Sequence, residues 1–221
     1  MLKHYEREVV RLKERVTRLG QKVEEQVRTA FHATMVRDQA LARSVIDDDD
    51  FIDQEEVELE EECLKLLALH QPVAIDLRFI ISVLKINNDL ERIADIAVNI
   101  AQRAIRLSEL VQVEVPIELE QEAKRAKLML RKALLALVEM DAQLARDVLR
   151  SYRDLDALTH KALGLLLARI KSAPEQAEEN LLVLSIAKRL ERVGDLAANI
   201  AEDVVYMVEG EIVRHARDRM P

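Results

Sequence analysis

Two stretches of this sequence repeat acidic and amide residues at the same offsets inside otherwise apolar segments. Residues 86–101 read INNDLERIADIAVNIA and residues 186–201 read IAKRLERVGDLAANIA, so nine of sixteen positions are identical. The shared acidic and amide residues are Glu91, Asp95 and Asn99 in the first copy and Glu191, Asp195 and Asn199 in the second. A packed helix needs only apolar residues on its buried face, so the repeated polar pattern requires a specific explanation.

The repeated carboxylates fall on one line of a helix. At 100° per residue, Glu91, Asp95 and Asn99 project to the same side, on a line that is apolar in the turns before it. The second copy extends the line by one further carboxylate, Glu202. Because an isolated charge is costly to bury, three interpretations are open. The carboxylates are solvated at a groove edge, pair with Arg or Lys of a neighbouring helix, or bind a metal ion.

A stripe of charged residues runs beside this line in the first copy. Its members are Arg78, Lys85, Asp89, Arg92 and Arg103. We predict that this stripe faces solvent, and that the recurring Arg92 and Arg192 form salt bridges on the outer face.

An acidic run earlier in the chain supplies a possible second wall for a metal site. Asp49 and Asp53 form another Asp-x-x-x-Asp pair near the start of a predicted helix. In an antiparallel bundle the start of this helix faces the end of the next one, which carries Glu91 and Asp95. Four carboxylates with few histidines suit iron, manganese, magnesium or calcium more than a structural zinc. The alternative is a solvated acidic helix start, which the helix dipole also favours.

Long helices must position these residues. Apolar residues make up 49% of the chain, with only four Gly and four Pro, and apolar residues recur at spacings of three and four. The pattern predicts helices over residues 2–37, 39–70 and 73–107, then, after a linker at 111–116, helices ending near 140, 171 and 210. Asp38 and Asp141 are the expected N-caps of the second and fifth helices.

The two halves of the chain are copies of one unit. Residues 38–43, DQALAR, resemble residues 141–146, DAQLAR, at an offset of 103, whereas the polar motif repeats at an offset of 100. The two offsets differ by three residues, and this deletion falls at the interhelical junctions, where loops tolerate changes in length. We therefore predict an all-α fold of two tandem antiparallel three-helix bundles, residues 1–110 and 111–221, the second with a polar C-terminal tail.

Composition excludes several classes of protein. A net charge of −8 argues against a general nucleic-acid surface. The single cysteine, Cys63, cannot form an intrachain disulfide and is expected to be a small buried hydrophobe. No uncharged apolar run approaches the length of a membrane span. We expect a soluble cytoplasmic protein.

A longer signature resembles a known family. Residues 63–78, CLKLLALHQPVAIDLR, together with LERIAD at 90–95 and LERVGD at 190–195, resemble the PhoU family over both halves. The resemblance implies two three-helix bundles whose E/DxxxD motifs hold multinuclear iron clusters or other metal ions on the surface, with manganese, magnesium or zinc as further candidates. By position, the implied ligands are Asp49, Asp53, Glu91, Asp95, Asp156, Glu191 and Asp195, with Asn99, Asn199 and Glu202 as a supporting polar stripe. Tyr152 replaces the equivalent of Asp49, so the second site departs from the pattern.

The resemblance also implies a function. PhoU proteins are regulatory adaptors that repress the phosphate-starvation response, linking the ATPase subunit of the phosphate ABC transporter to a membrane sensor histidine kinase. We therefore expect a homodimer without catalytic residues that reaches the membrane only through its partners.

Two other functions compete with the adaptor. A carboxylate di-metal enzyme would place Glu-x-x-His on facing helices, but none of the five histidines follows a glutamate by three positions. A purely structural helical scaffold accounts for the helices but leaves the repeated Glu, Arg, Asp and Asn unexplained. The sequence therefore favours the adaptor.

Overall fold

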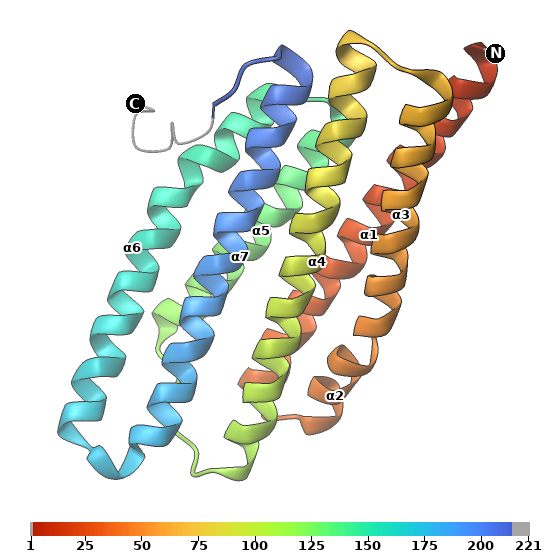
Figure 1. Ribbon diagram of the computed structural model, residues 1–221. Helices are drawn as coiled ribbons and strands as arrows, with labels where there is room; N and C mark the ends of the chain where they lie inside the picture. The colour runs from red at the N-terminus through yellow and green to blue at the C-terminus, as the bar shows by residue number, and fades with distance from the viewer. Residues whose placement is uncertain (1, 214–221) are drawn as a thin grey trace.

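The computed structural model describes residues 2–213 and is built from helices, with no β-strand among those residues (Figure 1). The helices are α1 (Leu2–Val36), α2 (Gln39–Asp47), α3 (Asp49–His70), α4 (Ala74–Glu109), α5 (Ile117–Glu139), α6 (Ala142–Ser172) and α7 (Ala177–Glu209), with a 3-10 turn at Pro174–Gln176. The expected tail that runs on to Pro221 lies largely outside the described residues.

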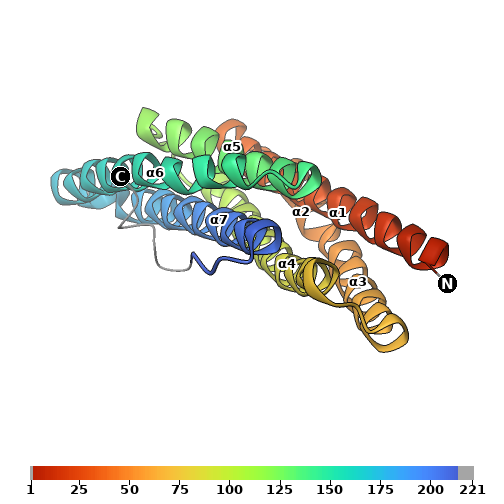
Figure 2. The same ribbon diagram turned by 90° about the horizontal axis from the view of Figure 1, so that it is seen from above.

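The helices form two antiparallel three-helix bundles that lie side by side. The first contains α1, α2 with α3, and α4, and the second contains α5, α6 and α7. Seen from above, α4 and α7 meet along the middle of the molecule, and α1 and α5 approach each other on one side of them (Figure 2). This confirms the predicted all-α fold with an internal repeat. The division into two domains at residues 110 and 111 stays a prediction, and one hydrophobic cluster runs through both bundles.

The expected helix over residues 39–70 is broken at Asp48. There the chain makes a turn, and α3 starts afresh at Asp49. Four consecutive aspartates, residues 47–50, favour a turn because they repel one another and Asp is a weak helix former. The Asp48 carboxylate is held by the Lys22 ammonium of α1 at 2.7 Å. Asp49 therefore lies in the first turn of α3, where the helix dipole stabilises an anion.

Both predicted N-caps are confirmed. The Asp38 carboxylate accepts hydrogen bonds from the backbone N–H groups of Ala40 and Leu41, at 2.8 and 3.1 Å. The Asp141 carboxylate accepts one from Leu144 N–H at 2.9 Å. These caps satisfy backbone donors that the first helical turn leaves unpaired.

Two glycines allow helices to approach closely. A Cβ atom on Gly20 would lie 2.5 Å from Leu134 Cδ2, where α1 contacts α5. A Cβ atom on Gly194 would lie 2.0 Å from Leu155 Cδ2, where α7 packs on α6. Both distances are far inside van der Waals contact, so these positions require glycine as long as the leucines stay in place.

The charged stripe of α4 does not simply face solvent, and that prediction was wrong. Asp89 is buried, the Lys85 ammonium forms an ion pair with Asp203 of α7, and Arg103 Nε donates to Ser185 Oγ at 2.8 Å. Arg92 alone keeps an exposed side chain of the predicted kind. The stripe lies largely along the contact between α4 and α7 because α4 is covered on two sides, by its own bundle and by the other one.

Candidate functional site

The structure brings two of the predicted carboxylate pairs together. Asp49 and Asp53 occupy the first turns of α3, and Glu91 and Asp95 occupy the facing part of α4. Burial, and then the negative charges of Asp53, Asp95 and Asp50, together raise the pKa of Asp49 to about 6. Because Coulombic effects of this kind require short distances, the two helices hold the pairs close to each other. The predicted facing of the two helices is confirmed.

Glu56 joins this group. Burial and then the charges of Asp95, Asp53, Glu56 and Asp49 raise the pKa of Glu91. The pKa of Glu56 is itself raised by burial, by Glu60 and by Asp53. We call the set Asp49, Asp53, Glu56, Glu91 and Asp95 the α3–α4 carboxylate cluster. The sequence signal for Glu56 is its spacing, three residues after Asp53 and seven after Asp49, which places all three on one face of α3.

No basic side chain neutralises the predicted members of this cluster. Within residues 2–213, Asp49, Asp53, Glu91 and Asp95 form no ion pair with Lys, Arg or His. The nearest basic candidate in sequence, Arg92, instead contacts Asp89 at 3.5 Å. The cluster is therefore a concentration of negative charge without an internal counterion.

In the second bundle, by contrast, the two motif carboxylates of α7 pair with basic side chains. Glu191 pairs with Lys188 at 2.7 Å and Asp195 with Arg192 at 3.3 Å. Asp156 lies 3.3 Å from a ring nitrogen of His160. Tyr152 stands in the place of Asp49, as the sequence indicated.

Two sequence differences explain this asymmetry. Lys188 occupies the position of Asn88, so the second bundle has a cation next to its glutamate where the first has an amide. Arg189 occupies the position of Asp89, so Arg192 lacks the aspartate that holds Arg92 and turns to Asp195 instead. The two repeats share a motif but not its electrostatics.

The predicted supporting stripe has other contacts. Asn99 Nδ2 donates to the backbone oxygen of Asp95 at 2.8 Å, within its own helix. Asn199 is half-buried and Glu202 is buried in α7. Asn199 and Glu202 thus belong to α7 and not to the α3–α4 carboxylate cluster, and the supporting role of all three residues stays a prediction.

The cluster suits a cation in its chemistry but is not a finished coordination sphere. Among residues 2–213, no group of three or more His, Cys, Asp or Glu side chains is arranged to hold a metal ion. Carboxylates that repel one another separate, so a ligand set would form only when a cation draws their oxygens together. Carboxylate oxygens are the donors that iron, manganese and magnesium accept.

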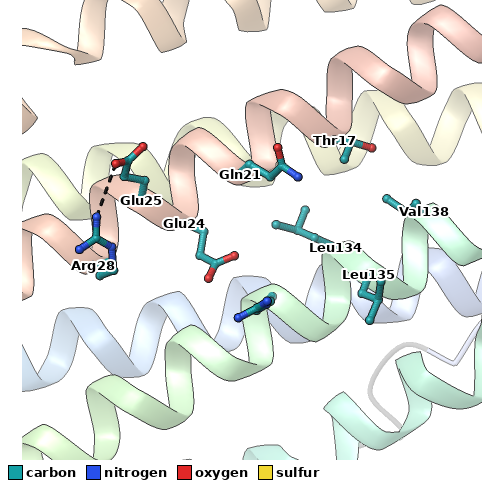
Figure 3. A pocket seen from close by; sticks show the side chains of 9 residues that line it. Thr17, Gln21, Glu24, Glu25, Arg28, Leu134, Leu135 and Val138 are labelled. Carbon is teal, nitrogen blue, oxygen red and sulfur yellow. Dashed lines mark hydrogen bonds and ion pairs between the residues drawn. The ribbon is translucent and has the colours of Figure 1, made fainter.

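A cavity elsewhere does not include the candidate ligands. It has a volume of about 610 Å³ and lies between α1 and α5 (Figure 3). Leu134, Leu135 and Val138 form its apolar part, and the Glu25–Arg28 pair lies at its edge. None of its lining residues belongs to the α3–α4 carboxylate cluster.

Sequence reasoning missed a buried carboxyl in the second bundle. Glu122 of α5 is fully buried, and its Oε1 accepts a hydrogen bond from Thr159 Oγ1 at 2.7 Å. Burial and, to a smaller extent, the negative charge of Glu191 raise the pKa of Glu122 to about 8, although the Thr159 hydrogen bond and the Lys188 charge act in the opposite direction. The available signal was spacing, since Glu122 lies three residues after Leu119 and four before Ala126, on the apolar face of α5.

Comparison with known proteins decides the family. The family model described as the PhoU domain matches twice, at residues 16–104 and at residues 119–204, so that each bundle contains one match. The chain belongs to the PhoU family. No helix among residues 2–213 is long and apolar enough to cross a membrane.

Relatives of the PhoU family match along nearly the whole chain. The "phosphate-specific transport system accessory protein PhoU homolog 1" of Thermotoga maritima is 35% identical, over 94% of this chain and 90% of that protein. A PhoU homologue of Pseudomonas aeruginosa is 40% identical, over 89% of this chain and 82% of its own.

Solved structures agree with the fold. The crystal structure of PhoU from Pseudomonas aeruginosa superposes with a TM-score of 0.89 at 37% identity, covering 94% of this chain and all of that one. PhoU of Streptococcus pneumoniae, titled a phosphate transport system regulatory protein, gives a TM-score of 0.87 at 31% identity. These relatives are named as accessory or regulatory proteins rather than as enzymes.

Proposed function

We propose that this protein is a regulatory adaptor of phosphate uptake that represses the phosphate-starvation response when phosphate is plentiful. Acting in the cytoplasm, it links the ATPase subunit of a phosphate ABC transporter to a membrane sensor histidine kinase. The observation that carries this proposal is the family match in both bundles, together with relatives named as accessory proteins of phosphate-specific transport. No nucleotide or active-site motif in the sequence calls for catalysis.

The outer face of α3 supports a partner-binding role. Val57 and Leu64, seven residues apart and therefore on one face of this helix, each leave about half of their surface exposed. Exposed apolar residues that follow one helix suit contact with another protein. We include a second copy of the chain, as a homodimer, among its partners.

We further propose that the α3–α4 carboxylate cluster binds metal ions, with iron the first candidate and manganese, magnesium or zinc as alternatives. Glu91 and Asp95 would supply oxygens from α4, and Asp49 and Asp53 from α3. A divalent or trivalent ion would offset the mutual repulsion that, together with burial, raises the pKa of Asp49 and Glu91. The bound ions would tie α3 to α4 and stabilise the face that partners meet.

Metal binding in the second bundle is the weaker half of this proposal. An ion at Glu191, Asp195 and Asp156 would first have to displace Lys188, Arg192 and His160. Breaking these contacts costs free energy, whereas metal binding to the α3–α4 carboxylate cluster breaks no such contacts. We therefore expect the first bundle to fill before the second.

Elemental analysis of the purified protein tests the metal proposal. In the double variant Glu91→Gln, Asp95→Asn we expect most of the bound metal to be lost, because both α4 ligands lose their charge. The matched control is Glu191→Gln, Asp195→Asn, which changes the equivalent residues of α7 and should keep most of the metal. Equal metal content in the wild type and the first variant would rule out the assigned ligands.

Affinity capture from membranes tests the adaptor proposal separately. With a tagged chain in cells grown on abundant phosphate, we expect the transporter ATPase and the sensor kinase to co-purify. Deleting the gene should release the starvation response in the same medium. A normal response in the deletion strain would contradict the repressor role, whatever the metal content.

A further inference from the structure

Two arginines of different bundles meet at one serine. Arg103 Nε of α4 donates to Ser185 Oγ of α7 at 2.8 Å, and Arg189 Nη1 of α7 donates to the same oxygen at 2.6 Å. Both guanidinium groups therefore lie within hydrogen-bond distance of a single hydroxyl. All three residues are half-buried, so part of each remains in contact with solvent.

The protein leaves much of their hydrogen-bonding capacity unused. Arg103 Nη1 donates to Asn99 O at 2.7 Å, and Arg189 Nη1 also donates to Ser185 O at 3.0 Å. Within residues 2–213 the Nη2 groups of both arginines donate to nothing. Because Ser185 Oγ accepts from both arginines, its own hydroxyl hydrogen is left to donate elsewhere.

The two positive charges are not neutralised. Among the described residues neither Arg103 nor Arg189 forms an ion pair with a carboxylate. Burial lowers the pKa of Arg189, and the neighbouring charge of Arg103 lowers it further. The next arginine along α4, Arg106, is by contrast fully paired, with Glu178 and Glu109 at 2.7 and 3.0 Å.

The internal repeat provides a comparison within the same molecule. Positions 103, 185 and 189 correspond, at the offset of 100, to 203, 85 and 89. There Lys85 pairs with Asp203, and Asp89 is balanced by Arg92. At one end of the α4–α7 contact the charges are thus paired with opposite charges. The repeat-related end instead holds two positive charges, Arg103 and Arg189, and the Ser185 hydroxyl.

We propose that Arg103, Ser185 and Arg189 form a binding site for a small tetrahedral oxyanion of the inorganic phosphate type. Such an anion has enough acceptor oxygens to take hydrogen bonds from both guanidinium groups and from the hydroxyl at once. It would also supply the counterion that the two arginines lack. The half-buried position between α4 and α7 favours a small ion over a polypeptide.

The consequence is a ligand that links the two bundles. Arg103 belongs to the first bundle, and Ser185 and Arg189 belong to the second, so a bound anion strengthens the contact between α4 and α7. This inference goes beyond the proposed adaptor role and needs neither the metal ions nor the partner proteins. A protein that binds inorganic phosphate here would respond to phosphate directly.

Isothermal titration of the purified, metal-free protein with inorganic phosphate tests the site. Metal-free protein is needed because phosphate also binds metal ions held by carboxylates. We expect saturable binding of one phosphate per chain, weakened roughly tenfold or more by Arg103→Gln and by Arg189→Gln, since each removes a charge-assisted contact. The matched control is Arg106→Gln, which also removes one positive charge, one turn further along α4. Because Arg106 is already paired with Glu178 and Glu109, this change should leave the affinity for phosphate unchanged.

Several outcomes would decide the matter. Absence of saturable phosphate binding to the wild type would overturn the proposal, as would unchanged affinity in folded Arg103→Gln or Arg189→Gln protein. If circular dichroism shows that these variants do not fold, Ser185→Ala is the remaining variant, and unchanged affinity there would count against the site. Equal binding of sulfate would support the oxyanion site and show that it selects shape and charge rather than phosphate. Failure of the adaptor role would leave all of these measurements unaffected.

Discussion

Replacing Glu122 by glutamine is expected to remove a large part of the pH dependence of this protein's stability. Glu122 is fully buried among α5, α6 and α7, and its pKa is raised from 4.5 to about 8. In the unfolded chain the carboxyl ionises near its ordinary pKa, while in the folded chain it keeps its proton until about pH 8. The folded state therefore binds more protons than the unfolded state between these two values, and stability falls as pH rises through this window.

The magnitude follows from linkage between the two pKa values. A shift from 4.5 to about 8 lowers the free energy of unfolding by about 3 kcal/mol at pH 7, compared with a carboxyl whose pKa is unchanged. Between pH 5.5 and 7.5 the loss grows by about 2.5 kcal/mol. Glutamine keeps the size of the side chain and the acceptor for Thr159 Oγ1, but it cannot ionise, so this slope disappears.

Urea denaturation at pH 5.5, 6.5 and 7.5 measures the effect. The quantity to compare is the change in unfolding free energy with pH, because glutamine also buries an additional amide N–H that shifts the absolute value. Glu139→Gln, at an exposed position of the same helix, is the matched control and should keep the wild-type slope. If Glu122→Gln and the wild type lose the same unfolding free energy between pH 5.5 and 7.5, Glu122 is not a buried protonated carboxyl in the folded protein.

Three further predictions concern stability and reactivity. Gly194→Ala should lower the free energy of unfolding by roughly 1–3 kcal/mol, because the new Cβ would lie 2.0 Å from Leu155 Cδ2; unchanged urea midpoints would contradict the close contact of α6 and α7. Cys63 should react with Ellman's reagent at pH 8 only after denaturation, because the thiol is buried and its pKa is raised to about 12; rapid reaction of the native protein would show that it is accessible. Asp141→Ala should cost about 1 kcal/mol by removing the hydrogen bond from Leu144 N–H, and an unaltered thermal midpoint would dispute that cap.

Much of the fold was predictable because its signals are local. Apolar residues at spacings of three and four, the capping residues Asp38 and Asp141, and prolines at the junctions predict the helices and their approximate ends. The facing of Asp49 with Asp95 was also predictable, because short connections force successive helices to run antiparallel. The break at Asp48 was not predicted, because apolar residues at helical spacing continue on both sides of the aspartate run.

The electrostatics of the candidate sites depended on contacts that the sequence does not specify. Glu91 and Glu191 lie in the same motif, yet only Glu191 forms an ion pair. The reason is that Lys188 occupies the position that Asn88 holds in the first repeat. Asp89 looked like a solvent-facing residue of α4, but it is buried where α7 covers the helix. Helical periodicity shows that two faces of a helix differ, but it does not show that a second bundle covers one of them.

The sequence by itself determined the helices, their duplication and the family, because each depends on patterns within a segment or on likeness to other sequences. Only the tertiary structure decided which charges are neutralised. It left the α3–α4 carboxylate cluster without a counterion and placed Arg103 beside Arg189 from the opposite bundle. The physical reason is that Coulombic energy and burial depend on distances between elements far apart in sequence, and those distances are set by how the helices pack.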